Sequence, residues 1–286
     1  MKIKVKSYYH SNTFTWSHLV ICQKTNVAIL IDPVLDFKQQ NGTTSTQSSD
    51  EIIDYITQNK IDLKLLLETH IHADHLTASA YIHKKLGCKT MIGKGVIEVQ
   101  KTFKEFFNLG ADFNPNGSQF NGLLADKETI KFGQCELTAM HTPGHTIDSM
   151  TYIVDDNIFI GDTLFAPNYG SARCDFPGGD AATLYDSVHR IYALGANKKL
   201  YLCHDYPKSI REPQPYFLSF EQQENNVHLN KNTSKGDFIK LRENRDKKLD
   251  NPKLIFPSVQ VNIAAGVLPL PEDNGVSYLK MPISNK

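Results

Sequence analysis

The chain has 286 residues, of which 40% are apolar, so it can bury a sizeable core and is neither a miniprotein nor a disordered tail. Thirty-one Lys and Arg balance 31 Asp and Glu, which excludes a global field that favours nucleic acid or an anionic membrane. Five scattered cysteines without a CxxC pair argue against a disulfide framework and a structural zinc cluster, and the sequence shows neither an apolar leader nor a membrane span, so we expect a cytoplasmic protein.

Strand-like and helical patterns alternate in the first third of the chain. Residues 2–9 and 13–23 are rich in β-branched and aromatic residues, which predicts a hairpin or a pair of edge strands. Ser48 and Glu51 have the spacing of a capping box at the start of a helix. In chain order we expect strands at 2–9, 13–23, 27–32, 63–67 and 89–92, and helices at 48–59 and 78–86.

After a turn-rich stretch that begins at Asn114, the second half again shows strand-like patterns followed by a helical one. The turn at 155–157 joins two short strands into a hairpin. We expect strands at 128–132, 135–140, 150–154, 158–160 and 199–203, and a helix at 181–194.

Two packed sheets with helices outside them satisfy these patterns, so the predicted fold class is α/β, an αββα sandwich of two mixed sheets. We expect a catalytic domain over residues 1–212. Residues 213–286 are polar and helical and then Pro-rich, which indicates a C-terminal extension that packs on the same domain.

The sequence His70-Ile71-His72-Ala73-Asp74-His75 directly follows an apolar strand, where open α/β sheets commonly hold ligands. Taken alone, such a segment is also compatible with a solvated histidine-rich turn. Three more strand ends carry the same residue types: His145 in HTPGHT, Asp162 in FIGDTL and His204 in YLCHDY. A shared metal site explains all four strand ends together.

These motifs (HIHADH, TPGHT, GDT and a final strand-end histidine) resemble the metallo-β-lactamase superfamily over about residues 13–206. The resemblance implies an αββα sandwich and leaves the reaction open. A dinuclear hydrolase would use His70, His72 and His145 for one metal and Asp74, His75 and His204 for the second, with Asp162 as bridge. A mononuclear ferrous site would use His70, His145 and Asp162 alone.

The segment that follows Asp162 resembles one subgroup, the persulfide dioxygenases. The shared pattern is R-x-D-F-x-x-G-D-A-x-x-L-Y-x-S, and glyoxalase II thioesterases have only part of it. The tail at 257–271 resembles bacterial members of the subgroup, some of them described only as β-lactamase-like hydrolases. The matching residues are Arg173, Asp175, Phe176, Gly179, Asp180, Leu184, Tyr185 and Ser187.

The resemblance implies one Fe(II) per chain and oxidation of a low-molecular-weight persulfide, typically glutathione persulfide, by O2 to sulfite and thiol. The alternatives are a thioester hydrolase of the glyoxalase II type with two zinc ions and a non-enzymatic sulfide sensor. We expect persulfide and O2 as partners, a homodimer as one candidate assembly, and neither nucleic acid nor membrane.

The implied roles extend beyond the three iron ligands. The outer residues His72, Asp74, His75 and His204 orient ligands and hold water. Glutathione-binding relatives carry a basic residue in the helical region after the final histidine, whereas residues 219–229 of this chain are acidic or neutral. Cys174 is interpreted as an inert buried thiol. The implied catalytic residues are Arg173, Asp175 and Tyr206, and the implied substrate contacts are Arg173, Tyr206, Lys208 and Arg211.

Overall fold

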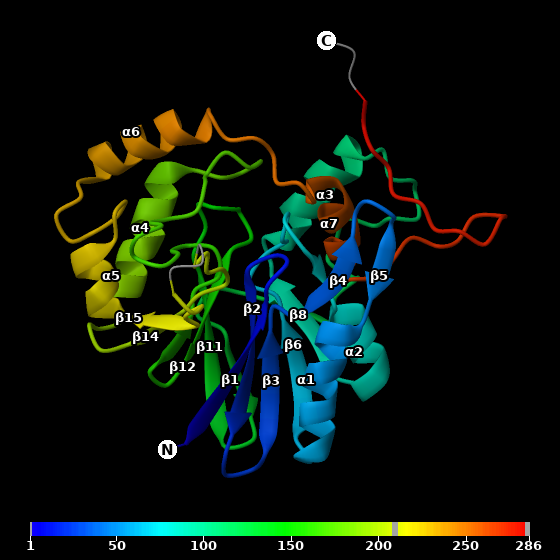
Figure 1. The fold of residues 1–286 in the computed structure, drawn as a ribbon, viewed down its shortest axis with the longest axis horizontal. Coiled ribbons are helices and arrows are strands. Elements are labelled where there is room, and N and C mark those ends of the chain that lie inside the picture. The colour runs from blue at the N-terminus through cyan, green and yellow to red at the C-terminus, as the bar shows by residue number, and fades with distance from the viewer. Residues whose placement is uncertain (1, 208–210, 284–286) are drawn as a thin grey trace.

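The computed structural model describes residues 2–207 and 211–283 as two six-stranded sheets packed face to face (Figure 1). The first sheet has the strand order β1-β2-β3-β6-β8-β9. Its strands are β1 (Ile3–His10), β2 (Thr15–Cys22), β3 (Val27–Ile31), β6 (Asp62–Leu67), β8 (Lys89–Gly93) and β9 (Gly122–Leu124).

The second sheet has the order β10-β11-β12-β13-β14-β15. Only β13 and β14 pair in parallel, while the other neighbours are antiparallel. Its strands are β10 (Thr129–Phe132), β11 (Cys135–His141), β12 (Met150–Val154), β13 (Asn157–Phe159), β14 (Lys199–Tyr201) and β15 (Tyr216–Leu218).

Helices cover the outer faces of the two sheets, which gives the four-layer αββα arrangement. A third, small sheet of β5 (Thr43–Ser45), β4 (Val34–Lys38) and β7 (Leu76–Thr77) lies beside the first. The helices of the described residues are α1 (Gln47–Gln58), α2 (Ser79–Leu86), α3 (Val96–Phe106), α4 (Ala181–Tyr192), α5 (Ser219–Asn225), α6 (Lys235–Asp246) and α7 (Ile255–Asn262).

Three clusters of buried apolar side chains hold the layers together. Side chains such as Val20 and Tyr152 fill the space between the two sheets. Ile52 and Ile82 of α1 and α2 pack on the outer face of the first sheet, and Leu184 of α4 packs on the second. Each helix therefore buries one apolar stripe against a sheet, as its sequence periodicity predicts.

The predicted strands and helices are present, with local differences. Residues 2–9 and 13–23 form the predicted hairpin, in which β1 is an edge strand and β2 is internal. The capping box at Ser48 is wrong, because α1 begins at Gln47 and the backbone N–H and Oγ of Ser48 donate to Asp36 (3.0 and 2.8 Å). Helix α3, absent from the prediction, contributes Val96 and Val99 to a further buried cluster.

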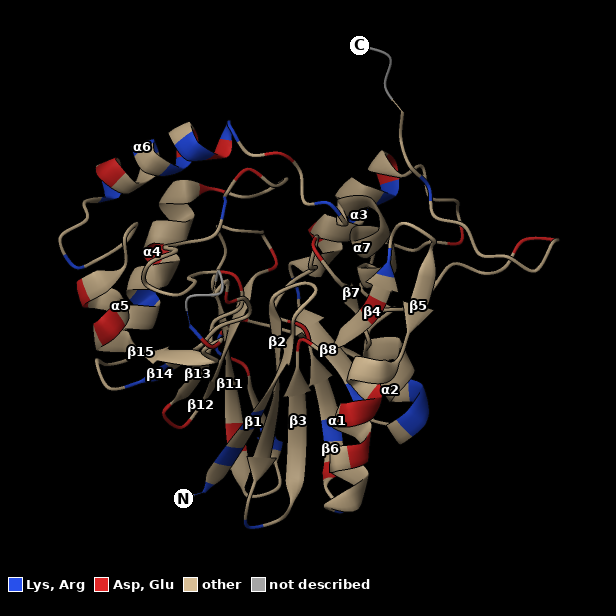
Figure 2. Ribbon diagram, in the orientation of Figure 1, with Lys and Arg blue, Asp and Glu red and all other residues tan. Residues whose placement is uncertain are grey.

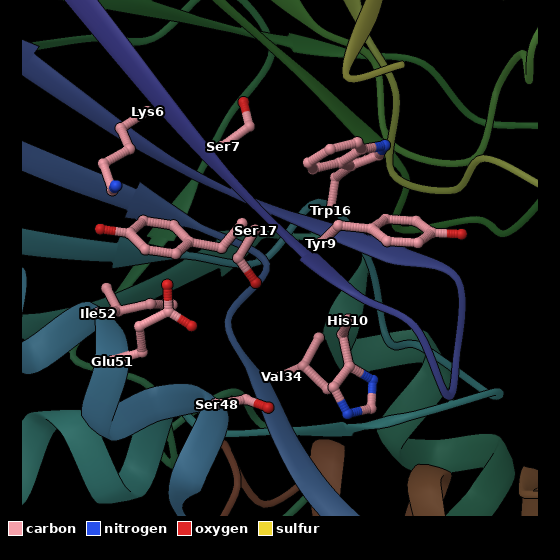
Figure 3. Close-up of a pocket in the computed structure, with 11 residues that line it drawn as sticks. Lys6, Ser7, Tyr9, His10, Trp16, Ser17, Val34, Ser48, Glu51 and Ile52 are labelled. Carbon is pink, nitrogen blue, oxygen red and sulfur yellow. The ribbon is translucent and has the colours of Figure 1, made fainter. Parts of the chain in front are cut away.

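Ser48 lines a cavity of about 330 Å³ between β1 and α1 together with His10 and Glu51 (Figure 3). Nε2 of His10 also lies 3.2 Å from Asp36, so the carboxylate joins the hairpin to the start of α1. We assign these contacts to packing of the hairpin against the helix.

The C-terminal segment packs on both halves of the sandwich. Helix α6 contacts α4, α7 contacts β7, and β15 completes the second sheet, so the boundary at residue 212 stays a prediction. Charges of both signs are interspersed along α6, whereas the charged residues of α1 are all acidic (Figure 2). Among the described residues, no helix combines the length and the apolar character needed to cross a bilayer.

A buried ion pair fastens α6 to the strand-end loops. The guanidinium of Arg242 pairs with Asp246 and donates to the Ser171 carbonyl at 3.1 Å, and Asp246 accepts from the Cys174 N–H at 2.9 Å. Both charged side chains are almost inaccessible to solvent.

We expect Arg242→Ala to lower the free energy of unfolding by about 3–5 kcal/mol, because it leaves the Asp246 charge buried and unpaired. Urea unfolding measures this difference. The matched control is Arg245→Ala on the same helix, an exposed arginine without a side-chain partner among the described residues, for which we expect a change of about 0.5 kcal/mol or less. Equal losses from the two variants would contradict this assignment.

Candidate metal centre

Four loops, each following a strand, meet at one end of the sandwich. In the second sheet β11, β13 and β14 run in the same direction, so the loops after them emerge at a common edge. These loops carry His145, Asp162 and His204, and the loop after β6 of the first sheet carries residues 70–75. The structure therefore brings together the seven side chains that the sequence motifs predicted.

His70, His145 and Asp162 form the inner set. Oδ2 of Asp162 lies 4.0 Å from Nε2 of His70 and 3.8 Å from Nε2 of His145. One donor atom of each residue lies within 4.8 Å of the other two, and all three side chains are buried. Two imidazoles and one carboxylate around a common point are the donor set of a two-histidine, one-carboxylate iron site.

The outer set lies on the other side of Asp162. Oδ1 of Asp162 lies 3.6 Å from Nε2 of His204, and Oδ2 of Asp74 lies 3.1 Å from the same nitrogen. The rings of His75 and His204 lie edge to face, with centroids 5.8 Å apart. The two oxygens of Asp162 thus face different histidines, which is also the arrangement of a carboxylate that bridges two metals.

Hydrogen bonds on the far side of each imidazole select the nitrogen that remains free for a metal. Nδ1 of His145 donates to the Arg173 carbonyl (2.7 Å), and Nδ1 of His75 lies 3.3 Å from the Leu76 carbonyl. In both residues Nε2 is left with its lone pair toward the centre. Nδ1 of His70 and of His204 likewise contacts the hydroxyls of Thr69 and Thr15 (3.0 and 3.3 Å).

His72 is held by buried carboxylates behind the site. Its Nε2 lies 3.0 Å from Asp32 and 3.5 Å from Glu68, which leaves Nδ1 toward the metal position. Burial by itself raises the pKa of the Asp32 carboxyl, but His72 and hydrogen bonds from Thr69 hold that pKa below its usual range. Asp32 is therefore an anion at neutral pH that fixes both His72 and the backbone before His70.

The polar atoms that face the centre support a metal there. Four of them are fully buried and have no hydrogen-bond partner among the described residues, an arrangement that costs free energy unless a ligand satisfies them. Burial, followed by the neighbouring imidazoles, lowers the pKa of His70 well below its usual value, which keeps this ring neutral and able to ligate. The four atoms are His72 Nδ1, His75 Nε2, His204 Nε2 and Asp162 Oδ1.

Two residues outside the motif histidines shape the loops. Nδ2 of Asn262 in α7 donates to the carbonyls of His72 and His75, each at 2.8 Å, so the C-terminal segment helps to hold the histidine loop. Gly144 has φ +136, and a Cβ there would lie 2.4 Å from the backbone of Leu184. The turn that presents His145 therefore requires glycine.

A pocket of about 420 Å³ opens beside the inner set. Arg173 and Tyr206, two of the residues predicted as substrate contacts, line it, and that role stays a prediction. Arg173 pairs with Asp175 (2.6 Å) and lies over the Phe176 ring, while Tyr206 stacks on His204. The pocket thus combines aromatic and other apolar side chains with three arginines, of which Arg173 is fixed by its ion pair with Asp175.

The other predicted residues lie elsewhere. Asp175 reaches the pocket only through Arg173, and the guanidinium of Arg211 pairs with the buried carboxylate of Asp205 rather than lining the pocket. Lys208 lies outside the described residues. Burial raises the pKa of the Cys174 thiol to about 12, in agreement with an inert cysteine. As substrate contacts, Lys208 and Arg211 stay predictions.

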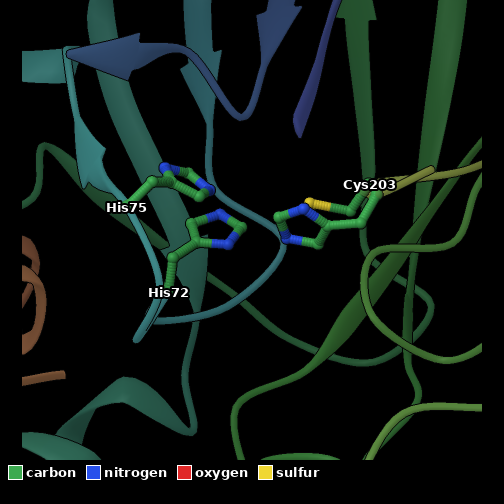
Figure 4. Close-up of side chains that lie close together, drawn as sticks. His72, His75 and Cys203 are labelled. Atoms are coloured by element: carbon green, nitrogen blue, oxygen red, sulfur yellow. The ribbon is translucent and has the colours of Figure 1, made fainter. Parts of the chain in front are cut away.

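Cys203 is a site residue that the sequence reasoning missed. Its sulfur belongs to the same group of neighbouring donor atoms as His72, His75 and His204 (Figure 4). Burial, followed by the Asp162 carboxylate, raises the pKa of this thiol well above its usual value. Its position directly before the strand-end histidine was the available signal.

Comparison with known proteins supports this description. Residues 12–204 match the metallo-beta-lactamase superfamily model. Glyoxylase B2 of Dictyostelium discoideum is 42% identical over 285 residues, which make up 99% of this chain and 98% of that protein. Human mitochondrial persulfide dioxygenase ETHE1 is 28% identical over 271 residues, 93% of this chain and 89% of that protein.

The crystal structure of ETHE1 from Myxococcus xanthus matches with a TM-score of 0.74 and 28% identity, over 92% of this chain and all of that chain. These matches confirm the resemblance and the αββα fold that the sequence predicted. The relatives carry names of both the hydrolase and the dioxygenase type, so the reaction has to be argued from the site.

Proposed function

We propose that this chain, which belongs to the metallo-beta-lactamase superfamily, is an iron-dependent persulfide dioxygenase. The reaction consumes a low-molecular-weight persulfide, O2 and water and yields the thiol, sulfite and protons, with glutathione persulfide as the expected substrate. The observation that carries the proposal is the contact between the segment that begins at Arg173 and the metal ligand His145.

That segment acts on His145 from two sides. The Arg173 carbonyl accepts the Nδ1 proton, which fixes the tautomer, and the Phe176 ring lies edge-on to the imidazole with centroids 5.2 Å apart. Two of the residues that resemble the persulfide dioxygenase subgroup, Arg173 and Phe176, are therefore part of the wall around the metal position. The similarity to human ETHE1 supports the same reaction.

In this proposal His70, His145 and Asp162 hold one Fe(II), which when bound supplies positions for the substrate sulfur and O2. Tyr206 and Phe165 provide apolar surface beside these positions and limit the access of water. Arg173, fixed by Asp175 and by the Asp250 carbonyl (2.7 Å), presents a positive charge toward an anionic persulfide.

The second candidate is a thioester hydrolase of the glyoxalase II type with two zinc ions. It is favoured by the geometry of Asp162, whose two oxygens face different histidines, and by the similarity to glyoxylase B2. In that reaction a metal-activated water attacks the carbonyl, and O2 takes no part.

Oxygen dependence separates the two candidates. We expect O2 uptake with sulfite production when the anaerobically purified, iron-loaded protein receives glutathione persulfide, and no turnover under nitrogen. An oxygen electrode combined with sulfite analysis measures this. S-lactoylglutathione serves as the matched control substrate, with little hydrolysis expected. Thioester hydrolysis at equal rates with and without O2, together with no persulfide-dependent O2 uptake, would establish the hydrolase instead.

A further inference from the structure

Cys203 lies inside the metal centre although no step of the proposed reaction uses it. It follows β14 and directly precedes His204. Its sulfur and one nitrogen each of His72, His75 and His204 all lie within 4.8 Å of one another, and all four residues are at most 1% exposed. In Figure 4 the rings of His72 and His75 point toward the side chain of Cys203.

Independent atoms at the same place point to a ligand. His72 Nδ1 and His75 Nε2 are buried without a hydrogen-bond partner among the described residues, and the buried Nε2 of His204 faces the carboxylates of Asp74 and Asp162 (3.1 and 3.6 Å), two further candidate metal ligands. The opposite nitrogens of these rings contact Asp32, the Leu76 carbonyl and Thr15. The free nitrogens therefore converge on the region of the thiol, and a cation there would satisfy all three.

The spacing and chemistry fit a divalent cation that prefers sulfur. A tetrahedral zinc ion lies about 2.0–2.1 Å from imidazole nitrogen and about 2.3 Å from thiolate sulfur, which puts neighbouring donors roughly 3.5 Å apart. Donor atoms within 4.8 Å reach that spacing by small side-chain movements. Thiolate together with imidazole selects Zn²⁺ or Co²⁺ over Mg²⁺ and Ca²⁺.

We propose that Cys203 is a metal ligand, which supplies a thiolate to a cation that His72, His75 and His204 hold on the outer side of Asp162. The centre then offers two unlike positions. The inner position has two imidazoles and a carboxylate, and the outer position contains sulfur. Sulfur ligation at the outer position is compatible with iron at the inner one and does not depend on which reaction the protein catalyses.

Cobalt titration of the metal-free full-length protein tests this proposal without measuring turnover. We expect an intense near-ultraviolet absorption from thiolate-to-cobalt charge transfer, which saturates as the second equivalent of Co²⁺ binds. Cys203→Ser is expected to lose this absorption and to keep the weaker visible bands of cobalt at the inner position. Cys174→Ser, which removes a buried thiol outside this group of donors, is the matched control and should keep the full spectrum.

Two results would overturn the proposal: no charge-transfer absorption at any Co²⁺ concentration, or the same absorption in Cys203→Ser as in the wild type. Zinc X-ray absorption of the wild-type protein gives a reading that does not require a stable variant. We expect a sulfur scatterer at about 2.3 Å, whereas a shell of nitrogen and oxygen alone at about 2.0–2.2 Å would exclude Cys203 as a ligand.

Discussion

Replacing His145 or Asp162 with alanine is expected to remove both the bound iron and the persulfide-dependent O2 uptake. Each substitution deletes one of only three protein donors in the inner set, whose other members lie within 4.8 Å. The loss should exceed the roughly 10–100-fold effect that is typical of residues that only orient a metal ligand. Elemental analysis of protein purified anaerobically from iron-supplied cells, together with oxygen-electrode rates, measures both quantities.

His204→Ala is the matched control for this prediction. His204 faces the opposite oxygen of Asp162, so the variant should keep much of its iron. Iron close to one equivalent per chain in the wild type is part of the same expectation. Equal iron loss from all three variants would show that the outer residues are primary ligands, and two zinc ions per chain with activity restored by zinc alone would favour the hydrolase.

The metal-binding loops were predictable because their chemistry is local in sequence. His70 to His75 are adjacent in the chain, and His145, Asp162 and His204 each follow an apolar strand, so the rule for strand ends places them at a common edge. The αββα layering was predictable for a similar reason, because each helix and strand shows its own hydrophobic period.

The hydrogen bonds that hold the metal-site histidines in place were not predictable, because they join segments that are far apart in the sequence. Asp32 precedes Pro33 and has the sequence appearance of a turn, whereas in the structure it binds His72, forty residues away. Asn262 reaches the histidine loop from about 190 residues along the chain. A single sequence contains no signal for such pairings.

The ion pair of Arg211 was also not predictable from the sequence. The sequence predicts Arg211 as a substrate contact, which stays a prediction, and gives no sign that its guanidinium pairs with the fully buried carboxylate of Asp205. An unpaired buried carboxylate is costly, and the Arg211 guanidinium neutralises the one of Asp205. Sequence proximity to a site therefore does not show where a long side chain points.

The second large effect is expected from replacing Asp32, which holds the histidine loop through hydrogen bonds. Asp32 accepts hydrogen bonds from the N–H and the hydroxyl of Thr69 (2.7 and 2.9 Å) and from Nε2 of His72 (3.0 Å). Its φ is +50, a left-handed conformation that aspartate tolerates better than most residues. Alanine would leave these donors buried without partners in a strained backbone position.

We therefore expect Asp32→Ala to lower the free energy of unfolding by about 3–5 kcal/mol and to weaken iron binding by roughly 10–100-fold. Urea unfolding and iron titration under anaerobic conditions measure the two effects. Asp32→Asn keeps an acceptor for Thr69, whose hydroxyl contacts Nδ1 of the iron ligand His70 (3.0 Å), so it should recover much of the stability and of the iron affinity.

Asp36→Ala is the position control for this prediction, because Asp36 is also a hydrogen-bonded aspartate of the same segment. Its hydrogen-bond partners are Ser48 at the start of α1 and His10 at the end of β1, and among the described residues none of its hydrogen bonds is with His70, His145 or Asp162. We expect a loss of about 1 kcal/mol and unchanged iron binding. If Asp32→Ala bound iron as tightly as Asp36→Ala, the buried carboxylate would stabilise the fold alone, and the position of His70 would not depend on the hydrogen bonds between Asp32 and Thr69.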